Sequence, residues 1–507
     1  MSEPIVVEPW DEHNRTLVDN VHPPAWIDPE PAPRYNLVVI GAGTAGLVTA
    51  IGAAGLGARV ALVERALMGG DCLNVGCVPS KALLRSARAR ADVRDAGEFG
   101  VGVPDGAATV DFAAVMARMR RLRARISATD SARRYRDHGV DVFLGAGRFT
   151  GPDTVEVGGR ALRFKKAVIA TGARATAPPI PGLAEAGYLT NETVFELTTL
   201  PPRLVVIGGG PIGCELAQAF ARFGARVTVL EAAPRVLLRE DPDAAALVAR
   251  ALERDGVQLH VGAAIARVER AGGERLVRYA AGGETRELRV DQVLVAAGRR
   301  PNVEDLGLEA VGVKHDAAAG VAVDDRLRTS NPRIYAAGDV CSRLQFTHNA
   351  DVQARTVIQN ALFFGRARAS ALTIPRCTYT DPEIAAVGLD EATAAERSVP
   401  VRTFVQDWAE LDRAMLDGED AGFVKVHVRA GTDRIVGATV VARHAGEMLS
   451  ELTMAMVHRV GLGAIARIIH PYPTQADAIR RLGDAYNRTR LTPIVKAAFA
   501  RWLRWTR

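Results

Sequence analysis

The fold is predicted most directly by residues 36–64, whose sequence is NLVVIGAGTAGLVTAIGAAGLGARVALVE. A short apolar run ends at Ile40, and a Gly- and Ala-rich segment of helical character follows it as far as Gly57. A second apolar run then leads to Glu64. This order predicts a strand, a helix and a second parallel strand, which is the repeating unit of a doubly wound sheet.

The turn between the first strand and the helix carries the glycine spacing of a dinucleotide site. Gly41 permits a tight turn, Gly43 lets the backbone approach a pyrophosphate, and Gly46 lets the helix pack on the strand. The unpaired N–H groups and the positive dipole end of the helix favour the same anion. Glu64 follows Gly41 by 23 residues, where a carboxylate can accept from a ribose hydroxyl. We therefore expect a bound dinucleotide here.

The same pattern returns at residues 204–231, LVVIGGGPIGCELAQAFARFGARVTVLE. Its glycines are Gly208, Gly210 and Gly213, and Glu231 again follows the first of them by 23 residues. Each copy follows a strand and opens a helix, so two dinucleotides are expected. The sequence predicts an α/β protein with two doubly wound, Rossmann-like dinucleotide-binding domains.

The second copy also bears on the choice of nicotinamide. A carboxylate at the ribose repels a 2′-phosphate, so Glu231 favours NADH over NADPH. Arg226 and Arg235 lie close enough in sequence to neutralise a 2′-phosphate, and NADPH therefore stays possible.

Size and composition limit the class of protein. A chain of 507 residues is too long for one core, so several domains are expected. The net charge of +6 does not indicate nucleic-acid binding, because acidic and basic residues are mixed along most of the chain. The N-terminus lacks a secretory signal, and no apolar run reaches about 18 residues. These features predict a cytoplasmic protein.

Redox chemistry is indicated by residues 69–81, GGDCLNVGCVPSK. Cys72 and Cys77 lie five residues apart at the start of a helix, a spacing that allows a disulfide across one distorted turn. The helix dipole and Lys81, one turn beyond Cys77, stabilise a thiolate. The five cysteines of the chain are too few and too scattered for a disulfide framework. The pair is therefore predicted to be redox-active in a reducing compartment.

The run CLNVGCVPSK strongly resembles the active-site signature of the flavin-dependent pyridine nucleotide–disulfide oxidoreductases. The resemblance extends over almost all of residues 35–485. Residues 170–172 and 297–302 resemble the domain-crossover motifs of this family, residues 335–339 its second FAD motif, and residues 380–383 the start of its dimer-interface domain. It implies that FAD and a nicotinamide dinucleotide are cofactors and that the protein is a homodimer.

The resemblance also implies roles for individual residues. Cys77 would lie against the flavin as the charge-transfer thiolate, and Cys72 would be the interchange thiol that meets the substrate. Lys81 would lie near flavin N5 and pair with Glu215. The remaining cofactor contacts that the resemblance implies are Gly147, Thr171, Gly172 and Asp339 for FAD, with Asp339 on the ribityl chain, and Gly298 for the nicotinamide dinucleotide.

The chain departs from the family pattern at residues 472–477, YPTQAD. Thiol–disulfide members carry His-Pro-Thr-x-x-Glu here, and the partner subunit supplies the histidine as acid–base for the interchange thiol. Tyr472 stands in place of that histidine and Asp477 in place of the glutamate, while His470 is two residues out of register. A tyrosine titrates near ~10 against ~6.5 for histidine, so it is a poor base at neutral pH. A tyrosine here resembles mercuric reductase, whose substrate is a thiolate-bound metal ion.

The resemblance to mercuric reductase is incomplete. That enzyme delivers its metal through a C-terminal cysteine pair, which this sequence lacks. Cys341 and Cys377 are expected to be buried apolar thiols, and no resident metal site is predicted. The favoured acceptor is a soft metal ion or a small disulfide. Two alternatives stay open, a thiol–disulfide enzyme of the dihydrolipoamide dehydrogenase type and a membrane-surface electron carrier of the NADH:quinone type.

The expected domains follow from these motifs. They are an extended N-terminal arm (1–34), an FAD-binding domain in two parts (35–182 and 299–370), an inserted NAD(P)-binding domain (183–298), an α+β dimerisation domain (371–487) and a tail (488–507). In the tail, Pro493 is placed to start a helix in which large apolar side chains alternate with basic ones. This predicts an amphipathic basic helix that contacts an anionic membrane, and the alternatives are a helix that packs on its own dimer or a frayed end.

Overall fold

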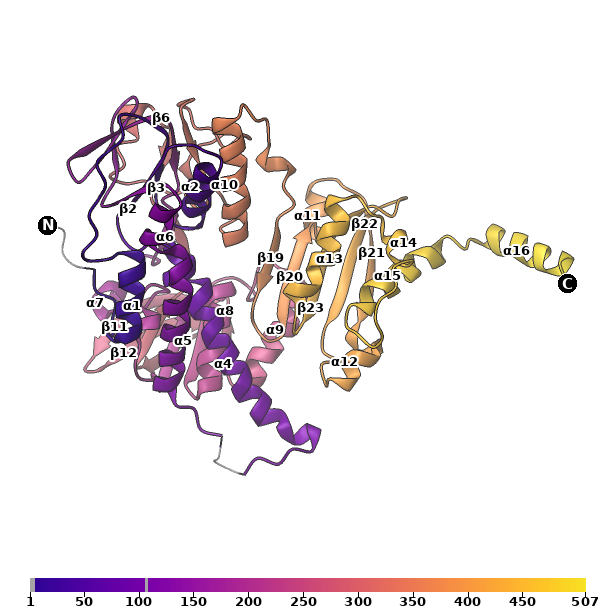
Figure 1. Ribbon diagram of the computed structural model, residues 1–507. Helices are drawn as coiled ribbons and strands as arrows, with labels where there is room; N and C mark the ends of the chain where they lie inside the picture. The colour runs from indigo at the N-terminus through magenta and orange to yellow at the C-terminus, as the bar shows by residue number, and fades with distance from the viewer. Residues whose placement is uncertain (1–4, 105–107) are drawn as a thin grey trace. The chain divides into compact units, whose positions relative to one another are not determined.

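The computed structural model describes residues 5–104 and 108–507. It comprises two compact units, one of Met1–Ala232 with Gly262–Leu372 and one of Ala233–Val261 with Thr373–Arg507 (Figure 1). Both units mix helices with sheets, and the predicted α/β class is confirmed.

A parallel sheet forms the centre of the first unit. Its strands are β3 (Val140–Leu144), β2 (Val60–Glu64), β1 (Tyr35–Ile40), β6 (Arg160–Ile169) and β18 (Ile334–Ala336), which lie side by side in that order. Four successive residues of β1 are all buried, with Leu37 and Val39 in one apolar cluster and Val38 and Ile40 in another. An unbroken apolar strand therefore marks a sheet covered on both faces, as the sequence suggested.

Helices cover one face of this sheet and short strands extend its edge. Helices α2 (Thr44–Gly55) and α10 (Thr347–Leu362) pack against each other, and their buried residues share a cluster with Leu37 and Val39. Strand β5 (Thr154–Val157) pairs antiparallel with the first half of β6, and β4 (Arg148–Gly151) pairs antiparallel with β5. Helix α2 begins directly after β1, which places its N-terminus at the carboxyl edge of the sheet.

The second glycine motif lies in a smaller parallel sheet of the same unit. Strands β9 (Arg226–Glu231), β8 (Arg203–Ile207) and β14 (Gln292–Val295) lie in that order, and α8 (Pro211–Phe223) connects β8 to β9. An antiparallel sheet of β11 (Ala264–Ala271), β12 (Glu274–Ala281) and β13 (Glu284–Val290) precedes β14 in the chain. Helix α4 (Cys77–Asp95) packs on both α8 and α5 (Phe112–Ser127), so it links the cysteine pair to this second motif.

The N-terminal segment is not an extended arm, in contrast to the prediction. Residues Glu12–Val21 form helix α1, which packs on α5. Asp11 caps it by accepting from the Asn14 N–H at 2.9 Å, and Leu17, Val18 and Val21 are buried. The proline-rich flanks of α1 hid this short apolar pattern. The remaining helices and strands of the unit are α3 (Gly70–Asn74), α6 (Ala132–Asp137), α7 (Leu183–Ala186), β7 (Ala173–Ala175), β15 (Arg299–Pro301), β16 (His315–Asp316) and β17 (Gly320–Val321).

An antiparallel sheet forms the core of the second unit. Its order is β19 (Pro375–Thr378), β20 (Glu383–Gly388), β23 (Ile435–Ala442), β22 (Phe423–Arg429) and β21 (Val401–Asp407). Helix α13 (Ala445–Val457) packs on β20 and β23, and α15 (Asp477–Thr489) on β21. The other helices and strand are α9 (Pro242–Arg254), β10 (Gln258–Val261), α11 (Glu391–Glu396), α12 (Asp412–Leu416), α14 (Leu462–Ile465) and α16 (Pro493–Trp505).

Helix α9 belongs to this second unit, although its residues lie within the segment 183–298 that the sequence assigns to the NAD(P)-binding domain. The Nζ atom of Lys425 on β22 lies 2.7 Å from a carboxylate oxygen of Asp241, the N-cap of α9, and 2.8 Å from one of Asp243. Arg376 on β19 pairs with Glu240 at 3.0 Å. Because both Lys425 and Asp241 are buried, these ion pairs fix the start of α9 on the sheet.

The substitution Lys425→Met should destabilise the protein strongly. It leaves the carboxylate of Asp241 buried without its cation, at a cost of about 3–5 kcal/mol. The matched control is Arg355→Met, which removes an exposed i,i+4 pair with Asp351 and should cost under about 0.5 kcal/mol. Urea unfolding of both variants measures the difference, and equal midpoints would show that the buried pair contributes nothing to stability.

Candidate active site

The two glycine turns have the same backbone geometry. The first glycine of each has a positive φ, +99° at Gly41 and +109° at Gly208, which side chains rarely tolerate. A Cβ atom on the third glycine would lie 1.8 Å from the carbonyl oxygen of the first at Gly46 and 2.0 Å from it at Gly213. Only glycine fits at these positions, because helix and strand approach too closely for any side chain.

The middle glycine of each turn is different. Gly43 and Gly210 are the N-caps of α2 and α8, and neither helix has a side-chain cap. A Cβ atom on Gly43 would come no nearer than 3.7 Å to its surroundings, and one on Gly210 would meet nothing within 4 Å. The first N–H groups of both helices can therefore be approached closely, and these residues fit the pyrophosphate of a dinucleotide.

The acidic residue after each motif also contacts its own turn. Glu64 accepts hydrogen bonds from the Ala42 N–H at 2.6 Å and the Ala66 N–H at 2.8 Å, and Glu231 accepts one from the Gly209 N–H at 2.5 Å. Burial raises the pKa of Glu64. Each carboxylate thus holds the glycine turn in place. The sequence pattern suggested the ribose contact but not this support of the turn.

The substitution Gly43→Ala should abolish FAD binding without unfolding the protein. The added methyl group has room in the protein but stands where the pyrophosphate must approach. Gly55→Ala is the matched control at the far end of α2, where a Cβ atom meets nothing within 4 Å. Flavin absorbance and circular dichroism of the purified variants give the answer, and a yellow, FAD-replete Gly43→Ala protein would contradict this assignment of α2.

The two cysteines of the signature lie on consecutive helices, the short α3 and the longer α4. Cys72 is in α3 and partly buried, and Cys77 is exposed at the first position of α4. Gly76 joins the two helices, and a Cβ atom there would lie 2.7 Å from the carbonyl oxygen of Asp71. The sulfur of Cys77 lies 3.5 Å from the hydroxyl oxygen of Thr347, at the N-terminus of α10.

The two sulfur atoms differ in acidity. The hydrogen bond from the Cys72 thiol lowers the pKa of Cys77 to about 6, with help from the Thr347 hydroxyl and the charge of Lys81. The same hydrogen bond, together with burial, raises the pKa of Cys72. At neutral pH the pair therefore holds one proton, which stays on Cys72, and one thiolate, which is Cys77.

Lys81 and Glu215 form an ion pair within the first unit. The Nζ atom of Lys81 on α4 lies 2.8 Å from a carboxylate oxygen of Glu215 on α8. Glu215 is buried, whereas the Lys81 side chain is about one-third exposed. The pairing that the resemblance implies is present. The place of Lys81 beside flavin N5 stays a prediction.

Lys81→Met and Glu215→Gln should move the pKa of Cys77 in opposite directions. Loss of the lysine charge removes a group that lowers this pKa, and loss of the glutamate charge removes one that raises it. Each shift should be about one unit. The pH dependence of iodoacetamide labelling, followed on the Cys77 peptide of the reduced enzyme, measures both. Lys165→Met on the exposed surface is the control, and shifts of the same sign in the two variants would contradict this electrostatic account.

Arg299 and two carboxylates form a cluster of charged side chains that includes Asp339, the residue expected to contact the ribityl chain. Arg299 makes ion pairs with Asp71, next to Cys72, and with Asp339, the latter at 3.7 Å. Burial raises the pKa of Asp339 to about 6, against the opposing charge of Arg299. The Nε atom of Arg299 is buried without a hydrogen-bond partner in the described part of the chain. These residues fit a polar group of FAD at this position.

The other predicted cofactor contacts occupy the turns between strands. The Thr171 hydroxyl donates to the carbonyl of Asn302 at 2.7 Å, and the Asn302 side chain donates to the Thr171 carbonyl. Gly172 has a φ of +69° and open space where a Cβ atom would be. Gly298 lies close to Thr176, and Gly147 lies against Val63 and Ile40. Gly147 thus packs on the sheet, and its contact with FAD stays a prediction.

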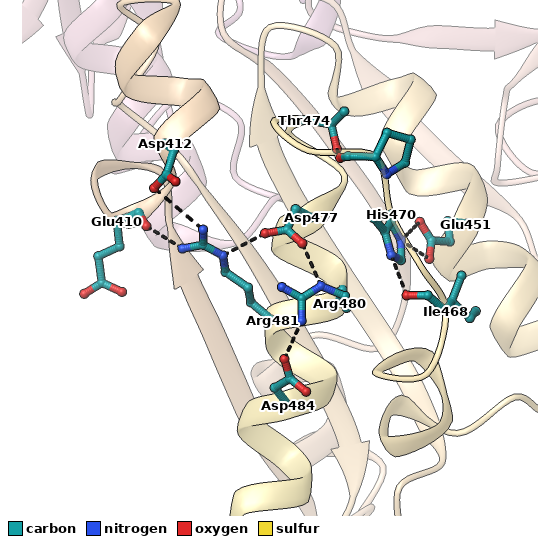
Figure 2. A network of polar contacts seen from close by, with 11 residues as sticks. Glu410, Asp412, Glu451, Ile468, His470, Thr474, Asp477, Arg480, Arg481 and Asp484 are labelled. Carbon is teal, nitrogen blue, oxygen red and sulfur yellow. Dashed lines mark hydrogen bonds and ion pairs between the residues drawn. The ribbon is translucent and has the colours of Figure 1, made fainter.

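In the second unit, Tyr472 and Asp477 do not pair with each other. The Tyr472 hydroxyl donates to Asp412 at 2.8 Å, and this hydrogen bond and the charge of Asp412 raise the pKa of Tyr472. Burial would raise the pKa of Asp477, but hydrogen bonds from Arg480 and Arg481 outweigh it and lower this pKa (Figure 2). Asp477 is thus part of a salt-bridge network on α15, and sequence reasoning missed Asp412.

His470, out of register with the family histidine, has its own carboxylate partner. Its Nε2 atom lies 3.0 Å from Glu451 on α13, and its Nδ1 atom lies 3.1 Å from the carbonyl oxygen of Ile468 (Figure 2). The His470 side chain is 6% exposed, in contrast to Tyr472, which is 73% exposed. Of the two side chains, Tyr472 is therefore the one that an incoming molecule can reach. No pattern in the sequence indicated that Glu451 pairs with His470.

Two glycine turns that fit dinucleotides, together with a thiol–thiolate pair beside a lysine, are typical of a flavoprotein disulfide reductase. Comparison with known proteins agrees. Residues 35–354 match the pyridine nucleotide-disulphide oxidoreductase model, and residues 374–482 match the dimerisation domain of these enzymes. The chain belongs to this family. Its members are FAD-dependent and take electrons from NAD(P)H, and the dimerisation domain supports a homodimer.

Individual relatives differ in what they reduce. The mercuric reductase of Bacillus cereus is 36% identical over 446 residues, which cover 88% of this chain and 70% of the relative. The dihydrolipoyl dehydrogenase of Thermus scotoductus is 34% identical over 463 residues, covering 90% and 98%. The HOCl-induced flavoprotein disulfide reductase RclA of Escherichia coli, in its Cu(II) complex, is 29% identical with a TM-score of 0.78, covering 88% and 98%. The family is therefore shared while the acceptor varies.

Proposed function

We propose that this flavoprotein passes electrons from NADH through the Cys72–Cys77 pair to a soft metal ion, as a mercuric reductase does. The proposal rests on one observation, the hydrogen bond from Tyr472 to Asp412, which keeps the pKa of this phenol above its ordinary value. In the proposed homodimer the partner subunit's Tyr472 stands where the family's thiol–disulfide members place a histidine.

The reduction of a disulfide requires a proton to move at the interchange thiol. When a disulfide substrate is reduced, the departing thiolate must be protonated and the interchange thiol must give up its proton, which a histidine near neutrality does well. A phenol that stays protonated at pH 7 cannot accept a proton from Cys72. A metal ion needs no such base, because its coordination displaces the thiol proton directly. The active-site chemistry therefore favours a thiolate-bound metal over a disulfide.

The residues of the first unit have complementary parts in this reaction. FAD, when bound, supplies the two-electron step between the nicotinamide and the cysteines. Cys77 holds a thiolate at neutral pH, and Cys72 keeps the proton until a substrate arrives. Lys81 offsets the negative charge of Cys77, and Glu215 fixes the lysine. Because its O–H donates to Asp412, Tyr472 has only oxygen lone pairs left, with which it can act as a weak ligand of a metal ion.

Relatives support the same class of acceptor. The Bacillus cereus relative is named for the reduction of mercuric ion, and RclA of Escherichia coli has been obtained as a Cu(II) complex. The named activity of the Thermus scotoductus relative is directed at a dihydrolipoyl group, which keeps a small dithiol or disulfide as the second candidate. For the donor, Glu231 at the second glycine turn favours NADH, since a carboxylate repels a 2′-phosphate.

The acceptor is tested by NADH oxidation under anaerobic conditions with Hg(II) in excess thiol, Cu(II), lipoamide, glutathione disulfide and a water-soluble quinone. Metal-dependent turnover, with release of Hg(0) or Cu(I), should exceed disulfide turnover by about tenfold or more. In Cys72→Ser, metal and disulfide turnover should fall by about 100-fold, while any direct transfer to quinone persists. Metal turnover that survives this substitution would overturn the proposal.

Tyr472 has its own test. Tyr472→His restores a base with a pKa near ~6.5 and should raise lipoamide turnover by about 100-fold. Tyr472→Phe should leave lipoamide turnover at its low starting value, because the phenol moves no proton. Tyr188→Phe, a partly buried tyrosine of the first unit, is the matched control. If Tyr472→Phe abolishes an already high lipoamide turnover, the protein is a thiol–disulfide enzyme instead.

A further inference from the structure

We propose that helix α16 (Pro493–Trp505) binds the surface of an anionic lipid bilayer. The helix lies at the end of the chain, beyond the residues matched by the dimerisation domain, 374–482. None of its residues is buried in the described structure. The proposal is independent of the electron acceptor, because it concerns only where the enzyme resides.

Local hydrogen bonds stabilise helix α16. The Thr492 side chain caps it by accepting from the Val495 N–H at 3.3 Å, and Pro493 occupies the first turn. Arg504 donates back to the carbonyl of Ala500 at 3.2 Å. The side-chain hydrogen bonds found for this segment, in the part of the chain that is described, stay within α16 and its cap. A preformed helix loses little entropy when it meets a surface.

The apolar residues of α16 fall on one side. At 100° per residue, the side chains of Ile494, Val495, Phe499, Trp502 and Trp505 span one half of the helix circumference. Ile494 is 82% and Trp505 76% exposed, and the rings of Trp502 and Trp505 lie 5.2 Å apart. Paired tryptophans on an exposed apolar face suit the interface between lipid headgroups and acyl chains.

The opposite side is basic. Lys496, Arg501, Arg504 and Arg507 occupy the other half of the circumference by the same helical spacing. Residues 485–507 contain six basic residues and no acidic one. This segment therefore complements an anionic surface. A second copy of the same segment would bring like charges together, which makes it the less favourable occupant of this face.

The length of the helix decides how it would lie. Thirteen residues extend roughly 20 Å, shorter than the ~30 Å core of a bilayer. Across the described residues, no helix combines the length and apolar character needed to cross a membrane. Helix α16 would thus lie in the plane of the interface, with the tryptophans toward the acyl chains and the arginines toward the headgroups.

Flotation of the FAD-loaded enzyme with lipid vesicles tests the proposal. Full-length protein should float with vesicles containing roughly one-third phosphatidylglycerol and at least about tenfold less with pure phosphatidylcholine. A chain ending at Arg490 should not float with either. Trp502→Ala with Trp505→Ala should lower flotation strongly, and the full-length protein should show a blue shift of tryptophan emission on the anionic vesicles.

The basic face is tested with two variants that each lose three positive charges, one in α16 and one elsewhere. The triple variant Arg501→Gln, Arg504→Gln and Arg507→Gln should lower the vesicle partition coefficient about 100-fold, or roughly fivefold per charge. The control removes three exposed arginines of the first unit, as Arg121→Gln, Arg133→Gln and Arg163→Gln, and should leave binding almost unchanged.

Two results would overturn the inference. One is equal flotation of the full-length and shortened chains. The other is a shortened chain that forms a smaller assembly in solution than the full-length protein, since a second copy would then cover the apolar face. NADH oxidation with a soluble acceptor should be the same for both chains. A loss of that activity would bear on the proposed function, and flotation alone bears on α16.

Discussion

The negative charge on the sulfur of Cys77 is the constraint around which the first unit is arranged. A thiolate at neutral pH requires hydrogen-bond donors and a nearby cation, and these come from separate parts of the chain. Cys72 precedes it in α3, Thr347 begins α10, and Lys81 follows one turn later in α4. Lys81 is held in turn by Glu215 of the second glycine motif. The duplicated dinucleotide fold thereby supplies both the cofactor sites and the charges that keep this sulfur reactive.

Much of this arrangement could be predicted from the sequence because it depends on patterns of residues that are close together in the chain. The apolar runs before Gly41 and Gly208 became β1 and β8, and the glycine spacings became two turns with matching φ values. Each of these glycines is imposed by a contact within a few residues, so spacing alone reveals it. The resemblance to a known family then supplied the long-range pairing of Lys81 with Glu215, which no local pattern contains.

The residues that were missed depend on contacts between distant segments. Asp412 orients Tyr472 across 60 residues of sequence, and Glu451 reaches His470 across 19. Helix α1 was hidden because prolines flank a short apolar pattern whose burial requires α5. Asp477 matched a family position by spacing, yet two arginines on its own helix engage its carboxylate. A position in a motif therefore identifies a residue without fixing its partners.

The ion pairs of α9 have a consequence for the way this chain can be divided. Residues 233–261 stand far from residues 373–507 in the sequence, yet they fold with them, and Lys425 is buried against Asp241. A fragment beginning after Leu372 would carry a buried ammonium group without its counterion. A recombinant exchange of the C-terminal region between family members must therefore bring the α9 segment from the same parent. An exchange of modules during evolution would meet the same restriction.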